Sequence, residues 1–219
     1  MSLNAKDAPG TVSRTPPLGQ GTYPARLVLV VDLGMQPQRP YKGQDKPPAN
    51  KILLTYEFVD EFMLDEDGQE MADKPRWLSE EMVLYNLEAE KAKSTLRYNV
   101  FDPNNIHKGD FGNLVNTPCN ITVVHNPKSS GGGVWENIAG VSEMRIKDMK
   151  KCPPLVNDPL VLDLDEPDMN VFEALPNWIK KKIVSNLEFK GSKLEGLLKE
   201  EQVPFPDTEL SSEAVETPY

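Results

Sequence analysis

Residues 117–143, TPCNITVVHNPKSSGGGVWENIAGVSE, decide the fold that this sequence predicts. β-branched side chains dominate residues 120–125, and an extended pattern resumes over residues 134–141 after three glycines. The pattern predicts two strands joined by a Gly/Ser loop. Apolar side chains occupy both faces of the first strand, whereas an open sheet with one wet face would alternate more cleanly. The wall of a barrel or sandwich is therefore favoured.

Three further strands and a helix are predicted ahead of this pair. The strands cover residues 22–33, 51–64 and 76–85, and an Asp-Glu-Asp-Gly turn joins the second to the third. Residues 86–100 change to a helical period, with Asn86 as the N-cap. Five strands with a helix between the third and fourth are typical of an OB-fold, so we expect a mainly β, OB-fold-like barrel. Other five-stranded arrangements remain open.

The chain is predicted to have four parts. Residues 1–20 are rich in Pro, Gly, Ser and Thr and are expected to form a flexible arm. Residues 21–150 form the predicted OB-fold domain, and residues 151–200 a C-terminal extension with short helices. One of these helices, around Trp178, could dock within the chain or on another subunit. Residues 201–219 are expected to be a disordered acidic tail.

Charge is segregated along the chain. The net charge of −10 would ordinarily argue against a nucleic-acid binder. However, residues 60–70, 163–168 and 201–219 together contain fifteen acidic residues and no base, which leaves the remainder at +5. The sequence therefore has room for a basic binding face.

Composition predicts a protein of the reducing cytoplasm that is not bound to a membrane. The apolar run at residues 27–31 is too short to cross a bilayer, and no charged-then-apolar leader opens the chain. Cys119 and Cys152 are far apart with no CxxC motif, so small buried side chains are expected rather than a disulfide or metal site.

No catalytic constellation can be assembled from the sequence. His107 and His125 stand alone, and neither phosphate-binding glycine motifs nor a nucleophile elbow occurs. The carboxylates of residues 60–70 lack the spacing of a calcium loop and suit a solvated turn. We therefore predict a protein that is not an enzyme and that needs no metal or cofactor.

Aromatic and basic side chains on the predicted strands and loops are the remaining functional signal. Proteins bind single strands by stacking bases on aromatic rings inside a basic groove. For each aromatic the alternative is core packing, and for the helical lysines it is a solvated face. The predicted DNA-binding residues are Tyr23, Arg26, Tyr41, Lys42, Lys51, Tyr56, Arg76, Trp77, Tyr85, Lys128, Trp135 and Arg145.

Several segments resemble a family of tailed-bacteriophage single-stranded DNA-binding proteins. They are GTYPARLVLVVDLGMQ, KPRWLSEEMVLYNLEAEKAKSTLR, NTPCNITVVHN with WENIAGVS, and the downstream LVLDLDEPDMNVFEALPNWIKKKI. The resemblance covers roughly residues 21–183. It implies an OB-fold that coats single strands during phage DNA replication, recombination or repair. Residues 98–107, YNVFDPNNIH, depart from the family pattern, so no ligand contact is carried over to the helix.

The acidic tail has two predicted roles. Residues 200–205, EEQVPF, are similar to the acidic Pro-Phe tips with which such proteins recruit replication enzymes, although here the motif is internal and the chain ends at Tyr219. An acidic tail can also compete with DNA for a basic groove. The rival hypothesis for the whole chain is an acidic protein-interaction or assembly module that never binds nucleic acid, and a plain solubilising tail would suit it.

Overall fold

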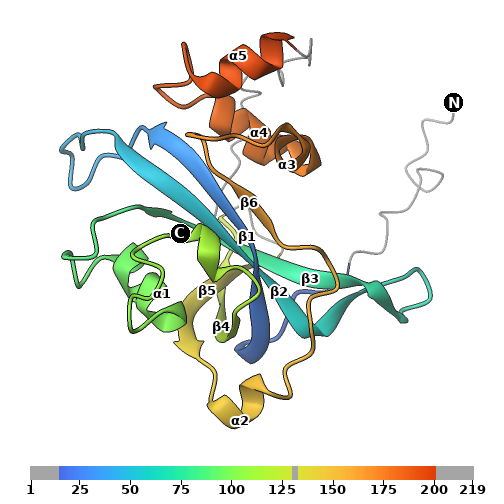
Figure 1. The fold of residues 1–219 in the computed structure, drawn as a ribbon. Helices are drawn as coiled ribbons and strands as arrows, with labels where there is room; N and C mark the ends of the chain where they lie inside the picture. The colour runs from blue at the N-terminus through green and yellow to red at the C-terminus, as the bar shows by residue number, and fades with distance from the viewer. Residues whose placement is uncertain (1–14, 130–132, 201–219) are drawn as a thin grey trace, which may run out of the picture.

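The computed structural model describes residues 15–129 and 133–200 (Figure 1). Within them the chain is mainly β, as predicted, and forms a six-stranded sheet accompanied by short helices. The strands are β1 (Gly21–Gln36), β2 (Ala49–Leu64), β3 (Glu70–Val83), β4 (Pro118–Pro127), β5 (Val134–Glu143) and β6 (Leu160–Leu162). The helices are α1 (Lys93–Phe101), the 3₁₀ turn η2 (Gly112–Leu114), α2 (Ile146–Met149), α3 (Met169–Ala174), α4 (Asn177–Val184) and α5 (Lys193–Glu200).

Strand β1 is the centre of the sheet. The order is β3-β2-β1-β4-β5 with every neighbouring pair antiparallel, while β6 adds to β1 in parallel. The first part of β1 pairs with β4 through residues 21–26, and a later part pairs with β6 through residues 29–31. An irregularity between Leu27 and Leu29 separates these two segments.

The sheet is open, because no hydrogen-bonded ladder joins β3 to β5 among the described residues. Side chains and the segment of residues 15–20 bridge these two edges instead. Arg76 of β3 donates to Glu136 of β5 and to the Pro16 carbonyl, each at 2.7 Å. The Leu18 amide also donates to Glu136, and the Leu18 side chain is only 3% exposed. Thus the described part of the predicted flexible arm is packed against the sheet, and the predicted closed barrel is not confirmed.

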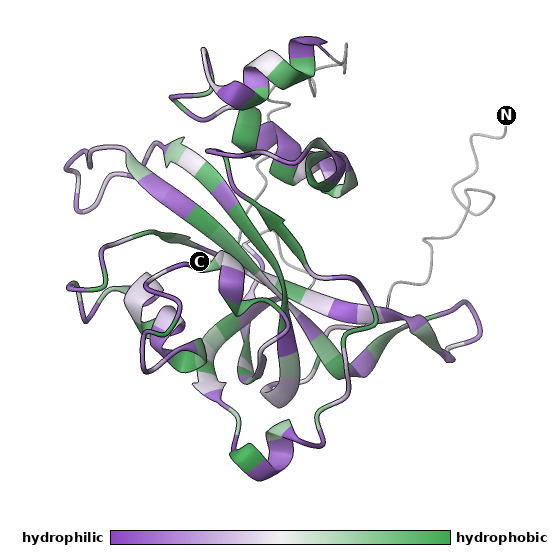
Figure 2. Ribbon diagram, in the orientation of Figure 1, coloured by the Kyte–Doolittle hydropathy of each residue, from purple (hydrophilic) through white to green (hydrophobic). Residues whose placement is uncertain are grey.

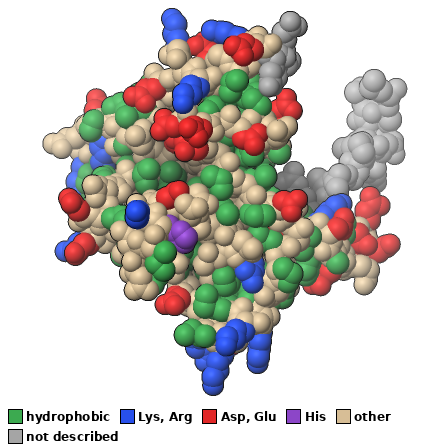
Figure 3. Space-filling view, in the orientation of Figure 1, with side chains coloured by type: hydrophobic (Ala, Val, Ile, Leu, Met, Phe, Trp, Pro, Cys, Tyr) green, Lys and Arg blue, Asp and Glu red, His purple; other side chains and the backbone are tan. Residues whose placement is uncertain are grey.

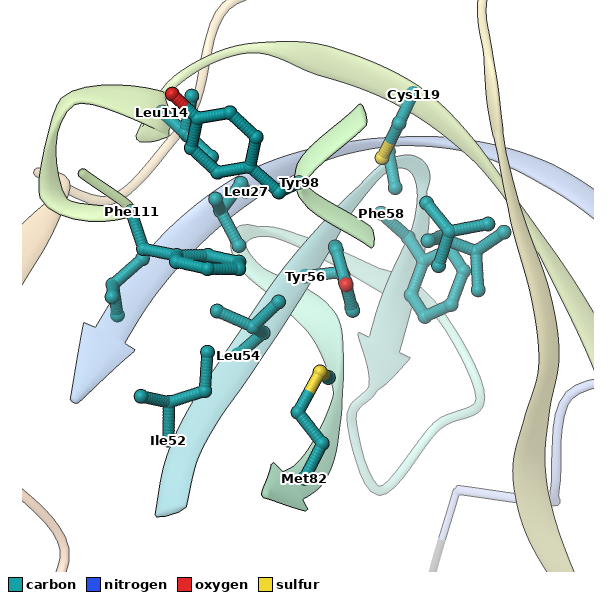
Figure 4. Close-up of a cluster of buried hydrophobic side chains, with 14 of the residues drawn as sticks. Leu27, Ile52, Leu54, Tyr56, Phe58, Met82, Tyr98, Phe111, Leu114 and Cys119 are labelled. Atoms are coloured by element: carbon teal, nitrogen blue, oxygen red, sulfur yellow. The ribbon is translucent and has the colours of Figure 1, made fainter. Parts of the chain in front are cut away.

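One hydrophobic cluster, the inner cluster, lies between the sheet and α1 (Figure 4). Its largest members include Tyr56, Phe58 and Tyr98, and the Tyr98 ring meets Phe111 edge-on with centroids 5.3 Å apart. The helix begins at Lys93, later than predicted, because Asn86 closes a turn instead of capping a helix. Its side chain accepts from the Glu88 amide at 3.0 Å and its carbonyl from the Ala89 amide at 2.9 Å.

A second hydrophobic cluster, the outer cluster, lies on the other face of β1 and β2. Its members from the sheet include Val28, Val31 and Leu53, and the C-terminal extension covers them. Ile179 and Ile183 of α4 are buried there, so the helix around Trp178 docks within its own chain. Figures 1 and 2 show α3, α4 and α5 grouped beside the upper part of β1, β2 and β6, where hydrophobic residues line the strands. This second layer explains why β1 is apolar on both faces.

Candidate nucleic-acid interface

The predicted DNA-binding residues do not form one continuous groove. Tyr56 is 0% exposed and its hydroxyl donates to Glu80 at 2.8 Å, so its ring belongs to the inner cluster and cannot meet a base. Tyr23 is half-buried, packs edge-on against Phe58 at 5.7 Å between centroids, and donates to the Gly19 carbonyl at 2.8 Å. Both tyrosines therefore hold the fold together.

Three of the predicted cations are occupied by protein partners. Arg26 donates to the Pro153, Asn116 and Cys152 carbonyls at 2.7, 2.6 and 3.0 Å, so it ties β1 to the start of the extension. Arg76 bridges β3 and β5 as described above. Lys51 pairs with Glu81, with 2.8 Å between Nζ and Oε1. The carboxylates of Glu136 and Glu81 offset the charges of Arg76 and Lys51, and the carbonyl partners of Arg26 occupy N–H groups that a phosphate would need.

Trp77 is 38% exposed on β3, but its indole is fixed. Nε1 donates at 3.0 Å to Glu57, a carboxylate that is 1% exposed. Glu57 also accepts from the Val156 amide at 2.6 Å and from Asn157 Nδ2 at 2.7 Å. These hydrogen bonds to Glu57 connect the C-terminal extension to β2 and β3. They leave one part of the Trp77 ring at the surface.

Lys128, Trp135 and Arg145 lie away from the β1–β2 loop. Lys128 Nζ stands 4.3 Å from the Trp135 ring centroid at the β4–β5 hairpin, a cation–π contact. Arg145 precedes α2 and pairs with Asp148 at 2.6 Å. Figure 3 shows basic side chains at the lower tip of the molecule, where Figure 1 places α2. The residues of this tip are Arg145, Lys147, Lys150 and Lys151.

Tyr41 and Lys42 lie together in the β1–β2 loop, residues 37–48. Tyr41 and Gln44 exchange backbone hydrogen bonds of 2.9 and 3.0 Å around Lys42 and Gly43. Both central residues have positive φ, 51° and 77°, as a type I′ turn requires. Gln38 donates to the Pro47 carbonyl at 2.7 Å and closes the base of the loop. The local sequence thus presents Tyr41 on a preset turn.

The Tyr41 ring is exposed and surrounded by cations. It is 58% exposed, and the Nζ atoms of Lys42 and Lys46 stand 5.4 and 4.8 Å from its centroid. Tyr85, 51% exposed, lies at the same end of the sheet because the preceding Leu84 amide bonds to the Asn50 carbonyl at 2.8 Å. This end of the sheet therefore combines two exposed aromatic rings with Lys42 and Lys46.

A hollow of about 390 Å³ lies beside Tyr41, between the loop and the end of β3. Arg39, Lys46 and Lys51 contribute cations to its wall, and Glu81 contributes a carboxylate. Glu81 also binds Lys182 of α4. Lys46, Arg39, Glu81 and Lys182 were not among the predicted site residues. The basic character of the loop was visible in the sequence, but the approach of α4 was not.

No group of three or more His, Cys, Asp and Glu side chains in residues 15–129 and 133–200 could hold a metal ion. Burial raises the pKa of the Cys119 thiol, which suits its place in the inner cluster. No helix in that part of the chain is long and apolar enough to cross a membrane.

Comparisons of the chain with models of protein families, with curated proteins and with solved structures found no match. A function is therefore inferred from the geometry at the end of the sheet that carries the β1–β2 loop, which we call the loop end.

Proposed function

We propose that this chain binds single-stranded DNA without regard to sequence, as a phage protein of DNA replication, recombination or repair. The observation that carries the proposal is Tyr41. An exposed ring on a preset turn, with two lysines beside it, suits the stacking of a base whose phosphates meet the lysines. A base that stacks on Tyr41 would displace one lysine ammonium group from the ring. That ammonium group would then be available to a phosphate of the DNA backbone.

The topology supports the proposal at the level of fold. Strands β1 to β5 follow the order β3-β2-β1-β4-β5, with α1 between β3 and β4. We propose that this is an OB-type barrel that opens between β3 and β5, where residues 15–20 bridge the edges. OB-folds use the loop between the first two strands and the loop between the fourth and fifth for oligonucleotide binding. Tyr41 belongs to the first of these loops. The Lys128–Trp135 pair belongs to the second, which lies away from Tyr41 and is not part of the proposed site.

The acidic segment 201–219 lies outside the described residues. We propose that it recruits phage replication proteins or competes with DNA for the loop end, because it carries five acids and no base. Affinity for DNA that rises when the chain is ended at Glu200 is the expected result, and unchanged affinity would contradict competition.

Anisotropy of a labelled dT oligonucleotide tests the function. The full chain should bind it more tightly than a duplex of the same length, with affinity that falls as salt rises. Tyr41→Ala should weaken binding by about 1–3 kcal/mol, the cost of one lost stacking contact. Tyr41→Phe, which keeps the ring, is the matched control and should bind nearly as well as the wild type.

A protein-interaction module is the second candidate, and one observation favours it. Arg26, Lys51 and Arg76, three of the predicted phosphate ligands, are engaged in intramolecular contacts. Absence of binding to the oligonucleotide, both for the full chain and for the chain ending at Glu200, would exclude the DNA proposal and support this one.

A further inference from the structure

Glu81 occupies an unusual position at the edge of the loop-end hollow. It lies on β3 between two lysines from distant parts of the sequence, Lys51 of β2 and Lys182 of α4. The Glu81 side chain is 9% exposed, against 14% for Lys51 and 24% for Lys182. The C-terminal extension thereby delivers a cation to the same end of the sheet as the Tyr41 loop.

This carboxylate stays ionised at neutral pH. Burial alone would raise the pKa of Glu81, but hydrogen bonds and charge from Lys182 and Lys51 outweigh burial and lower it. Three bases, Arg39, Lys46 and Lys51, and one acid, Glu81, line the hollow. Lys182 reaches its edge through the ion pair with Glu81. Glu81 is thus the carboxylate that holds both Lys51 and Lys182.

We propose that the hollow is a phosphate subsite for the strand whose base stacks on Tyr41, and that Glu81 acts as a built-in competitor of that phosphate. Lys51 and Lys182 are its additional ligands, and Lys182 makes the C-terminal extension part of the binding surface. The inference rests on the proposed function and deepens it. An incoming phosphate takes over ammonium hydrogen bonds that Glu81 accepts in the free protein, so part of the attraction is cancelled before DNA arrives.

The proposal predicts that removal of one carboxylate will raise the affinity for DNA. Glu81→Gln removes one negative charge and keeps the size of the side chain, so both lysines become available to phosphate. Affinity for a dT oligonucleotide should rise by about threefold to tenfold at low salt. The slope of log affinity against log salt should steepen by about 0.7 for each additional phosphate that is neutralised. A residue with a structural role alone would leave affinity unchanged or lower it.

Glu195→Gln is the matched control. Glu195 of α5 pairs with Lys199 at 2.7 Å, accepts from the Gly191 amide at 2.7 Å, and does not line the hollow. The substitution makes the same change in net charge and also breaks an ion pair, so it reports the effect of both changes outside the hollow. It should leave both the affinity and the salt slope close to those of the wild type.

A second pair of variants keeps the test decisive if Glu81→Gln does not fold. Lys182→Gln removes one proposed phosphate ligand and should weaken binding by about threefold to tenfold with a shallower salt slope. Lys181→Gln removes the same charge from the neighbouring, exposed position of α4 and should have a much smaller effect.

Outcomes of the experiment separate the two hypotheses. If the wild type fails to bind the oligonucleotide, the proposed function is wrong. If the wild type binds but folded Glu81→Gln binds no more tightly than Glu195→Gln, the phosphate subsite is wrong and the function stands. Equal effects of Lys182→Gln and Lys181→Gln would also overturn the subsite.

Discussion

Neighbouring carboxylates on β3 face two different environments. Glu80 points to the inner cluster, where it accepts from Arg97 at 2.6 Å and from Tyr56 at 2.8 Å, with Lys93 at 3.0 Å. Glu81 points to the opposite face and meets Lys51 and Lys182. Successive strand residues alternate between faces, so two adjacent acids attach one strand to two different layers.

The difference between these layers lies in where their partners come from. The inner cluster is completed by α1, the next helix after β3 in the chain, whereas the outer cluster is completed by α3, α4 and α5, which lie between Met169 and Glu200. Arg97 is nearly buried, and Lys182 is partly exposed beside the hollow. The ion pairs of Glu80, the inner clamp, are therefore suited to stability. The ion pairs of Glu81, the outer clamp, are more exposed, and we propose that a phosphate competes for them.

Truncation of core side chains should have the largest effects on the free energy of unfolding. It also tests whether the two layers unfold together. Phe58→Ala in the inner cluster and Phe172→Ala in the outer cluster should each lower the free energy of unfolding by about 3–5 kcal/mol. Because both clusters share β1, chemical denaturation should show one transition for each variant. A wild-type-like main transition in Phe172→Ala would mean that the extension is a separate unit.

The two clamps should differ in strength. Arg97→Met leaves Glu80 buried with only the half-exposed Lys93 as a cation, and should cost about 3–5 kcal/mol in the free energy of unfolding. Lys182→Gln breaks a more exposed pair and leaves Lys51 in place, so about 1 kcal/mol is expected. Urea denaturation of both variants measures the difference in the free energy of unfolding. Equal decreases in the two variants would contradict the predicted difference.

Acid should weaken both clamps. Burial would raise the pKa of Glu80, but Arg97 and Lys93 lower it below the ordinary value of 4.5, and Glu81 is likewise lowered. A lowered folded-state pKa contributes stability that is complete above the unfolded value and is lost as pH falls through the folded value. Thermal melts between about pH 6 and pH 3 should therefore show falling stability. The pH dependence should be shallower in Glu80→Gln, and an unchanged slope would argue against the inner clamp.

Periodicity predicted much of the sheet because strand patterning is local. The five long strands lie close to their predicted positions. The two-sided apolar pattern was assigned to residues 120–125, but β4 buries alternate residues, Cys119, Ile121 and Val123, and the strand covered on both faces is β1. Docking of the helix around Trp178 within the chain was one of two predicted alternatives, but the strands that it covers were not predicted, since the approach of Ile183 to β1 depends on long-range packing. The three-residue β6 was likewise read only as an extended segment.

The candidate site was predictable only in part. Tyr41 and Lys42 could be identified because a Pro- and Lys-rich loop rarely buries its aromatic residue. Tyr56 has the same residue type on an equally plausible strand, yet it is buried, because Glu80 and Arg97 supply a polar partner for its hydroxyl from positions distant in sequence. Residue type alone does not distinguish an exposed ring from a core ring.

The burial of β1 on both faces has a consequence for folding during synthesis. β1 leaves the ribosome early. The contact between Leu18 and Glu136 and the packing of Val31 in one cluster with α4 and α5 can form only after those later residues have been synthesised. Nascent chains expose transient apolar surface until such partners emerge. Until about residue 198 has been synthesised, one face of β1 stays uncovered, so truncated translation products should be prone to aggregation and good substrates for chaperones.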